Sequence, residues 1–262
     1  MSASAFIFKL TSPYTLTSRM ATQEEERSLQ ISSLQRRQEW IGARVVAKFA
    51  YLRSIGSPAT TGVWSVLSDQ ALHEVPESRM RALWIERPQT TGTPILWDSS
   101  RKQLVSSLSL SHQYPYVAAG ISCCGAIGVD IQETTAFSDD FVNHFLQAES
   151  GLLLAKAFEP PVSRHAKLTA LWTLKEACFK AVSLSSGCTN LRQITIVELD
   201  MKGLIEAFSG SNSGATYALR LRTPSGLVSL GFKTINFDRH FGSAVWPSAP
   251  GKAASRPTSQ LI

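Results

Sequence analysis

Apolar and polar residues alternate with period two in several short stretches of the chain. In Ser107–Ser111, leucines and serines take turns, which predicts a half-buried strand with leucines on one face and serines on the other. The same pattern predicts strands at Phe6–Leu10, Val117–Ser122, Ile127–Ile131, Ile194–Leu199, Thr216–Leu221, Leu227–Phe232 and Phe241–Trp246. Two of these, Val117–Ser122 and Ile127–Ile131, are close in the chain, so we expect them to pair around Gly125.

Apolar residues at helical spacing fill the stretches between these strands. Thr22 is the expected N-cap of the first helix, because three glutamates follow it where the helix dipole favours acids, and the pattern continues to about Arg53. Two further helices are predicted at Phe141–Ala157 and Ala166–Val182, split by Pro160 and Pro161.

The resulting order is strand, helix and strands, followed by strands, helices and strands. We interpret it as two α+β halves of similar plan, although the sequence carries no repeat that supports the similarity. The expected divisions are residues 1–122, residues 123–246 and a disordered tail at 247–262 that is rich in proline, serine and alanine.

The composition limits which classes of binding partner and which cellular compartment we expect. The 262 residues are 44% hydrophobic with a net charge of +6, which favours anionic partners without choosing among them. No run approaches the ~18 apolar residues of a membrane span, and we expect no signal peptide. The four cysteines, Cys123, Cys124, Cys178 and Cys188, lack the spacing of a zinc site, so we interpret them as reduced thiols of a cytoplasmic protein.

The helix predicted at Ala166–Val182 carries the most distinctive chemistry. Within Trp172-Thr173-Leu174-Lys175-Glu176-Ala177-Cys178-Phe179-Lys180, Glu176 and Lys180 lie on one side and apolar residues on another. The helix can therefore bury one face while it presents a carboxylate and an ammonium on a second face. Taken alone, the pair is better explained as an i,i+4 ion pair on a solvated helix.

Two strands carry further candidates. In Ile127–Ile131 the apolar residues alternate with Gly128, Asp130 and Gln132, and an acid at this place is either partnered or at a solvated edge. Ser111 and His112 end the serine strand, where they can bind a phosphate or stabilise a turn. A Ser–His nucleophile pair is disfavoured, because adjacent strand residues point apart and no GxSxG elbow is present.

Taken together and in this order, the three motifs resemble the signature of 4′-phosphopantetheinyl transferases of the surfactin-synthetase-activating type. Arg36–Arg44 is similar to the first-helix motif of that family, and Phe145–Glu149 resembles its segment between the last two motifs. The resemblance covers about residues 36–182.

The resemblance implies a monomer whose two similar halves are arranged like the subunits of a dimer, with coenzyme A between them. The implied reaction is the attack of a carrier-protein serine on the β-phosphate of coenzyme A, which would release 3′,5′-ADP. Asp130 and Glu176, with Gln132 as a neutral ligand, would hold Mg²⁺, and Glu176 or a metal-bound water would be the base. The remaining roles are phosphate contacts, assigned to Lys180, Lys175, Ser111, His112, Arg36, Arg37 and Arg44.

Three departures from the family pattern leave alternatives open. Gln132 stands where a second acid is common, Gly92-Thr93-Pro94 replaces Gly-Lys-Pro, and Ser183–Gly187 replaces a Gly-Leu loop. One alternative function is therefore a family member that binds carrier proteins without transfer. A basic protein that binds nucleic acid is another, although no nucleic-acid motif supports it.

Overall fold

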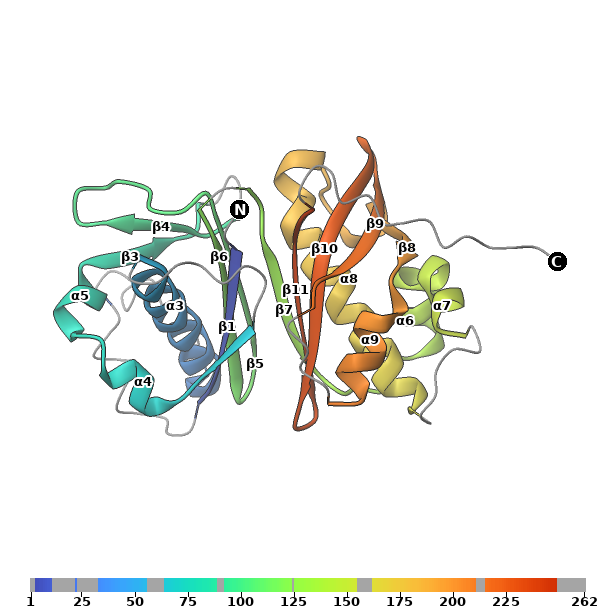
Figure 1. Cartoon of the computed structure of the whole chain (residues 1–262), viewed down its shortest axis with the longest axis horizontal. Helices are drawn as coiled ribbons and strands as arrows, with labels where there is room; N and C mark the ends of the chain where they lie inside the picture. Colours follow the sequence, from blue (N-terminus) through green and yellow to red (C-terminus); the bar gives the residue numbers. More distant parts are fainter. Residues whose placement is uncertain are drawn as a thin grey trace.

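The computed structural model describes residues 3–10, 22, 33–55, 64–88, 92–123, 125–154, 162–210 and 215–248. It is a mixed α+β structure, as the sequence predicts. Two sheets meet in the middle of the molecule and the principal helices cover their outer faces (Figure 1). The glutamates that follow Thr22 lie outside these ranges, whereas Thr22 itself is described and belongs to no helix or strand. The tail predicted at 247–262 also lies outside them except for its first two residues, of which Pro247 ends a strand.

The first sheet has four strands in the order β2-β1-β6-β5. They are β1 (Ala3–Lys9), β2 (Trp64–Leu67), β5 (Ser107–Gln113) and β6 (Tyr116–Ser122). Only β1 and β2 are parallel. Helix α3 (Leu34–Ile55) packs on the outer face, and residues 41–50 of this helix are buried because the helix lies against the sheet on one side and the small elements on the other.

Small elements complete the first half. A hairpin of β3 (Leu83–Glu86) and β4 (Ile95–Asp98) follows two short helices, α4 (Asp69–His73) and α5 (Glu77–Arg81). Their buried apolar residues join those of α3 and the sheet in one core.

The second sheet has five antiparallel strands in the order β7-β11-β10-β9-β8. They are β7 (Gly128–Glu133), β8 (Thr195–Leu199), β9 (Tyr217–Thr223), β10 (Gly226–Phe237) and β11 (His240–Pro247). The outer face carries α6 (Asp139–Phe145), α7 (Gln147–Leu154), α8 (Arg164–Ser186), the short 3-10 helix Leu191–Gln193 and α9 (Met201–Phe208).

Helix α8 begins and ends at residues suited to those positions. The Ser163 side chain accepts a hydrogen bond from the backbone N–H of Ala166, and Gly187 ends the helix in the left-handed conformation with φ of 67°. The helix lies directly on β7: a Cβ at Gly128 would be 1.9 Å from the carbonyl oxygen of Ala177. Gly128 therefore lets the helix approach the strand closely enough for side chains of the two elements to meet.

The two sheets are joined through serine hydroxyls instead of strand pairing. The Oγ atoms of Ser107, Ser109 and Ser111 on β5 accept hydrogen bonds of 3.1, 3.0 and 3.1 Å from the backbone N–H groups of Ile127, Val129 and Ile131. We call this set the serine ladder. The predicted leucine–serine alternation is confirmed, and the serine side faces the second sheet.

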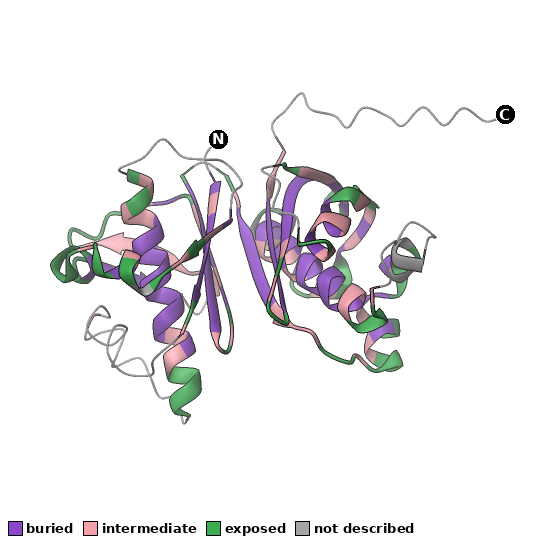
Figure 2. Cartoon of the chain, turned by 60° about the horizontal axis from the view of Figure 1, so that its bottom comes forward, coloured by how far each residue is buried: buried purple, intermediate pink, exposed green. Residues whose placement is uncertain are grey.

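The side chains between the sheets form a third apolar cluster, which includes Ile7, Trp64, Ala118, Val129 and Ile131. Figure 2 shows buried residues along the strands where the sheets face each other and on the inner sides of the long helices. The strand β7 is therefore buried on both faces, so Asp130 is not at a solvated edge: its residue is 3% exposed.

Three expectations from the sequence need correction. The strands β6 and β7 do not pair around Gly125, because β6 already has β1 and β5 as neighbours and the chain crosses to the other sheet. The helix expected at Phe141–Ala157 is two helices that meet at Leu146. Helix α9 lies in a segment for which the sequence analysis gave no element.

Candidate functional site

The structure brings Asp130, Glu176 and Lys180 together where β7 meets α8. The Nζ of Lys180 donates to Oδ1 of Asp130 at 2.7 Å and to the carbonyl oxygen of Val129 at 3.1 Å. The same nitrogen is 3.9 Å from Oε2 of Glu176. The predicted i,i+4 pair of the helix is thus present, but it faces a third, buried charge and is not simply a solvated surface pair.

The local geometry of the two elements explains this cluster. Alternation along β7 turns Asp130 and Gly128 to the same face, and Gly128 leaves room for α8 on that face. The helical period places Glu176 and Lys180 one turn apart on one side of α8. Leu171, Leu174 and Cys178 are completely buried on the other side and hold the helix in place.

The cluster has unused capacity for a cation. Oδ2 of Asp130 is buried without a hydrogen-bond partner, and a buried carboxylate oxygen of this kind is costly. Burial, the nearby charge of Asp130 and a hydrogen bond that protonated Glu176 can donate to the Asp130 carboxylate raise the pKa of Glu176 to about 7, while Lys180 opposes this shift. Two crowded carboxylates with an unpaired oxygen fit a hard divalent cation such as Mg²⁺, which takes oxygen ligands.

Gln132, the predicted third ligand, lies two residues beyond Asp130 on the same face of β7 and is partly exposed. No group of three or more His, Cys, Asp or Glu side chains suited to a metal occurs among the residues that the structure describes. The candidate ligand set therefore consists of two carboxylates and one amide, and its use by a metal stays a prediction.

The hydroxyl of Ser111 makes two hydrogen bonds to other groups of the protein. Its Oγ donates to Oδ1 of Asp130 at 2.8 Å and accepts from the N–H of Ile131 at 3.1 Å, and the residue is 6% exposed. The predicted phosphate contact of Ser111 therefore competes with a bond that holds Asp130. The sequence gave no signal for this bond, because the partners lie on different sheets.

His112, the next residue, turns to the opposite side of β5. Its Nδ1 is 3.3 Å from Oε2 of Glu39, a buried residue of α3. Burial lowers the pKa of His112; the charges of Lys180 and Arg36 also lower it, whereas Glu39 and Asp130 raise it. The ring is thus within electrostatic range of the Asp130–Lys180 cluster, and Glu39 is a partner that sequence reasoning missed.

The three arginines of the first-helix motif have different surroundings. Arg36 and Arg37 are exposed near the start of α3, and the charge of Arg36 acts on His112. Arg44 is 5% exposed; its guanidinium carbon is 3.0 Å from the ring centroid of Trp40, and its Nη1 donates to the Trp40 carbonyl oxygen. The structure therefore brings Arg36 toward the site and stacks Arg44 on the helix itself.

Lys175 is engaged in a buried ion pair. Its Nζ donates to Oε1 of Glu149 at 2.7 Å and to the carbonyl oxygen of Phe145 at 2.6 Å. The side chains of Lys175 and Glu149 are 4% and 1% exposed, and Oε1 of Glu149 also accepts from the N–H of Ile196. The pair joins α7, α8 and β8, while the predicted phosphate contact of Lys175 stays untested.

An aromatic cluster lies beside the end of α8 that carries Trp172. Phe137 and Phe141 stack with centroids 4.7 Å apart, and Phe141 and Phe145 approach the Trp172 ring edge-on at 4.7 and 5.6 Å. The three phenylalanines are only partly buried.

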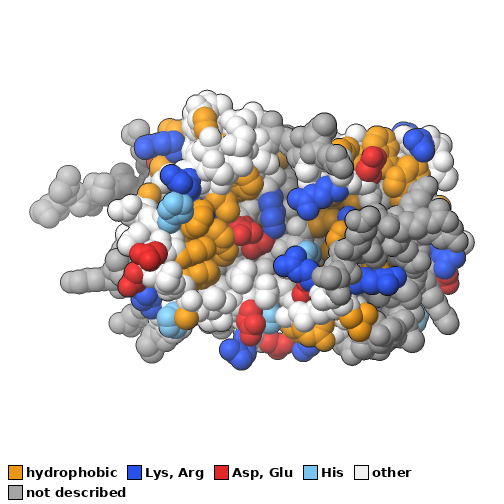
Figure 3. Space-filling model, turned by 180° about the vertical axis from the view of Figure 1, so that it is seen from behind, with side chains coloured by type: hydrophobic (Ala, Val, Ile, Leu, Met, Phe, Trp, Pro, Cys, Tyr) orange, Lys and Arg blue, Asp and Glu red, His pale blue; other side chains and the backbone are white. Residues whose placement is uncertain are grey.

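Figure 3 shows acidic side chains near the middle of one face, with a hydrophobic area on one side of them and basic side chains on the other.

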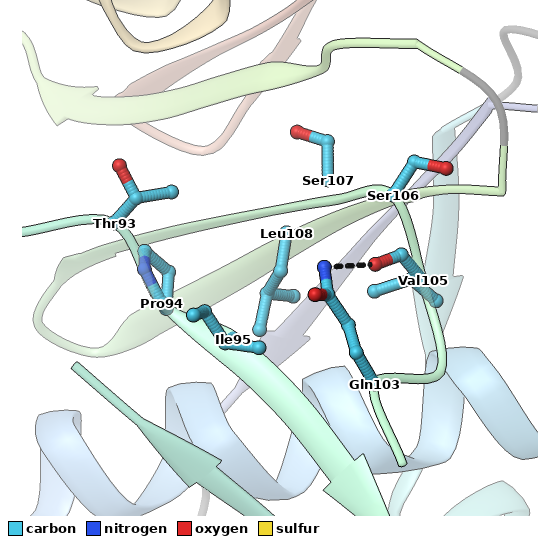
Figure 4. A pocket seen from close by; sticks show the side chains of 8 residues that line it. All are labelled: Thr93, Pro94, Ile95, Gln103, Val105, Ser106, Ser107 and Leu108. Carbon is cyan, nitrogen blue, oxygen red and sulfur yellow. Dashed lines mark hydrogen bonds between the residues drawn. The ribbon is translucent and has the colours of Figure 1, made fainter. Parts of the chain in front are cut away.

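A separate pocket of about 150 Å³ lies at the start of β5. Thr93 and Pro94 form one side and Ser106, Ser107 and Leu108 form the other (Figure 4). Thr93, which replaces the lysine common in the resembling family, thus lines a small pocket near the opposite end of β5 from Ser111 and His112.

The fold and the site together define a mixed α+β protein with a carboxylate–lysine cluster suited to phosphate and divalent-cation chemistry. Residues 126–221, which include β7 and α8, match the family model of the 4′-phosphopantetheinyl transferase superfamily. No curated protein matches the chain. The match supports phosphopantetheine transfer as the general chemistry of this region, and Asp130, Glu176 and Lys180 all lie within it. None of the described helices is both long and apolar enough to cross a membrane.

Proposed function

We propose that the protein is a 4′-phosphopantetheinyl transferase of the surfactin-synthetase-activating type, which moves phosphopantetheine from coenzyme A to a serine of an acyl or peptidyl carrier protein. The observation that carries this proposal is the cluster of the buried Asp130 with the half-buried Glu176 and Lys180 inside the matched region. Its unpaired Oδ2 of Asp130 fits a divalent cation, and Lys180 adds a positive charge for a phosphate.

The reaction breaks one P–O bond and forms another. The serine Oγ of the carrier protein attacks the β-phosphorus of coenzyme A, and the bond from that phosphorus to the bridging oxygen breaks, so 3′,5′-ADP leaves with the electron pair. Either Glu176 or a water on the bound metal would take the serine proton. Lys180 stabilises charge on the transferring phosphoryl group.

Asp130, Glu176 and Gln132 would hold Mg²⁺, which neutralises pyrophosphate charge when it is bound. The chain itself prepares the ligands: Ser111 and Lys180 fix Oδ1 of Asp130 and leave Oδ2 without a partner. Glu176 is held beside it by the contact of α8 with β7.

The N-terminal residues 1–122 and the C-terminal residues 123–246 would form the two halves of a pseudo-dimeric monomer. We place coenzyme A against both of them, with its 3′-phosphate near Arg36 and near His112, whose pKa the charges of Arg36 and Lys180 lower. The carrier protein is expected to have an acidic surface, and the partly exposed aromatic cluster of the C-terminal half is its proposed docking side. The compartment is the cytoplasm.

A mass assay tests this function. The purified protein is incubated with coenzyme A, Mg²⁺ and several apo-carrier proteins, and the carriers are weighed. We expect a gain equal to phosphopantetheine on at least one carrier and no gain in EDTA. Undiminished transfer in EDTA would contradict the metal role of Asp130 and Glu176. Coenzyme A binding without transfer to any carrier would instead support the alternative function, a family member that binds carrier proteins without transfer. The presence of Gln132 in place of a second acid favours that alternative.

A further inference from the structure

Glu39 is a buried carboxylate whose oxygens are occupied by groups at the turn between β5 and β6. It is 7% exposed. Oε1 accepts from the N–H of Tyr114 at 3.0 Å and from Nε2 of Gln35 at 3.4 Å, while Oε2 is 3.3 Å from Nδ1 of His112. Burying a carboxylate is costly unless several donors surround it, so these contacts hold Glu39 in one place.

The contact with Glu39 favours a proton on the nearer nitrogen of His112, Nδ1. An ionised carboxylate only accepts hydrogen bonds, so the proton of the neutral ring lies on Nδ1. Nε2 is then an acceptor in the neutral ring and a donor only in the imidazolium. The His112 side chain remains 41% exposed, so the ring is accessible although one edge is fixed.

The charges around His112 come from three elements. Glu39 and Arg36 belong to α3, Lys180 to α8 and Asp130 to β7, and all four act on the ring. Two of these groups, Arg36 and Lys180, are cations that can accompany the ring in binding an anion, whereas Glu39 already contacts the Nδ1 edge and Asp130 is paired with Lys180. A doubly charged phosphate monoester placed there would favour the imidazolium, whose Nε2–H donates to a phosphate oxygen.

We propose that Glu39 is a positioning residue for anion recognition: it holds the Nδ1 edge of His112 and thereby presents Nε2 to a terminal phosphate monoester of the ligand. Arg36 and Lys180 supply the accompanying positive charge. The ligand class, a nucleotide with a 3′-phosphate, rests on the proposed function. The positioning itself rests on the contacts of Glu39 with His112 and Tyr114.

Nuclear magnetic resonance of the free protein tests the positioning without any ligand. In protein labelled with ¹⁵N-histidine, the neutral ring of His112 is expected to carry its proton on Nδ1. In Glu39→Gln, which keeps the size of the side chain, this preference is expected to weaken. The control Glu77→Gln changes an exposed glutamate that pairs with Arg81, and it should leave the His112 signals unchanged. A wild-type ring protonated on Nε2 would overturn the proposal.

Calorimetric binding of two nucleotides tests the anion site. Wild-type protein is expected to bind adenosine 3′,5′-bisphosphate more tightly than adenosine 5′-phosphate. Glu39→Gln should reduce this preference about 10-fold, the usual effect of one charge-assisted hydrogen bond. His112→Ala should reduce it similarly, and the double variant should lose no more than His112→Ala alone.

Independent losses that multiply in the double variant would overturn the proposal, as would an unchanged preference in Glu39→Gln. Failure of the proposed function gives a different result: no carrier gains mass, while the tautomer and the nucleotide preference persist. Conversely, carrier transfer with equal binding of both nucleotides would overturn the anion site and leave the transferase intact.

Discussion

Ser111 donates a 2.8 Å hydrogen bond from its Oγ to Oδ1 of Asp130, so a hydroxyl on one sheet fixes a carboxylate on the other. The bond uses the donor of the hydroxyl, and the N–H of Ile131 uses its acceptor. Lys180 holds the same carboxylate oxygen from the opposite element, α8. The orientation of Asp130 therefore depends on the contact of the two sheets as well as on its own strand.

Replacing Ser111 by alanine should weaken Mg²⁺ binding by about 10- to 100-fold, the range found when outer partners of metal ligands are removed. The measurement is calorimetric titration of Mg²⁺ in the presence of coenzyme A. Ser109→Ala is the matched control, because it also removes one bond of the serine ladder but does not touch Asp130. Equal metal affinity in both variants would show that the Ser111–Asp130 bond is irrelevant to the site.

Replacing Glu176 by glutamine should stabilise the metal-free protein at alkaline pH. The pKa of Glu176 is raised from an ordinary value near 4.5 to about 7, so its proton favours the folded state. That contribution is complete below about 4.5 and is lost as the pH rises through 7. The variant should therefore exceed the wild type by ~1–3 kcal/mol at pH 8 and approach it at pH 4.

Urea unfolding in EDTA at several pH values measures this difference. The exposed pair Glu77–Arg81 supplies the control variant Glu77→Gln, which should show no such pH dependence. A constant offset at all pH values would mean that Glu176 is not perturbed. In the same variant, transfer to a carrier protein should be lost.

Replacing Lys180 by alanine should lower turnover ~10²–10³-fold and weaken coenzyme A binding much less, because a charge aimed at the transferring phosphate acts mainly in the transition state. Single-turnover kinetics and equilibrium binding separate the two effects. Lys202→Ala, an exposed lysine on α9, serves as the control. Near wild-type turnover in Lys180→Ala would show that this lysine only forms an ion pair with Asp130 and does not stabilise the transferring phosphate.

Replacing Lys175 by methionine should destabilise the protein by ~3–5 kcal/mol, because it leaves Glu149 buried without its counter-ion. The double variant Lys175→Met with Glu149→Leu should recover much of this loss, since neither charge then remains buried. Chemical unfolding of all three proteins measures the effect. A variant that keeps its stability and instead loses affinity for coenzyme A would support the phosphate contact predicted for Lys175.

Replacing Gln132 by glutamate should lower the Mg²⁺ concentration needed for half-maximal rate, because hard cations bind more strongly as ligand charge increases. Position 132 shares the face of Asp130 on β7, so the new carboxylate should reach the same cation. Titration of Mg²⁺ against the initial rate tests this, with Gln70→Glu on α4 as the control. Superimposable curves would place Gln132 outside the reach of the metal.

The sequence predicted the longer strands and the long helices because their signals are local, and it missed the four-residue strands β2, β3 and β4 and the short helices α4 and α5. Alternation marks β5 and β7, and α8 has both a helical apolar face and a serine before its first turn. Helix α9 escaped notice because its eight residues lie between strands and include Gly203, which packs against Phe232 and Tyr217. A glycine within a helix lowers the local helical signal, so only the tertiary contact explains it.

The site was predictable in its residue types and less so in its contacts. Asp130, Glu176 and Lys180 were expected to act together and they do meet. The partners Ser111 and Glu149 were not foreseen in their observed roles, because the motifs give Ser111 a phosphate contact and give Glu149 no partner. A serine face on a strand has the same pattern whether it faces water or a second backbone, so sequence alone cannot distinguish these surroundings.

The serine ladder has a consequence for how the sheets meet other chains. Strand β7 is the outer strand of its sheet, and the alternate N–H groups of Ile127, Val129 and Ile131 point away from β11. Unpaired edges of this kind are templates on which foreign strands add, a common start of aggregation. The serines of β5 occupy the edge with side chains that cannot extend the sheet further. The first half of the chain thus covers the open edge of the second sheet and keeps the strands of other chains from pairing with it.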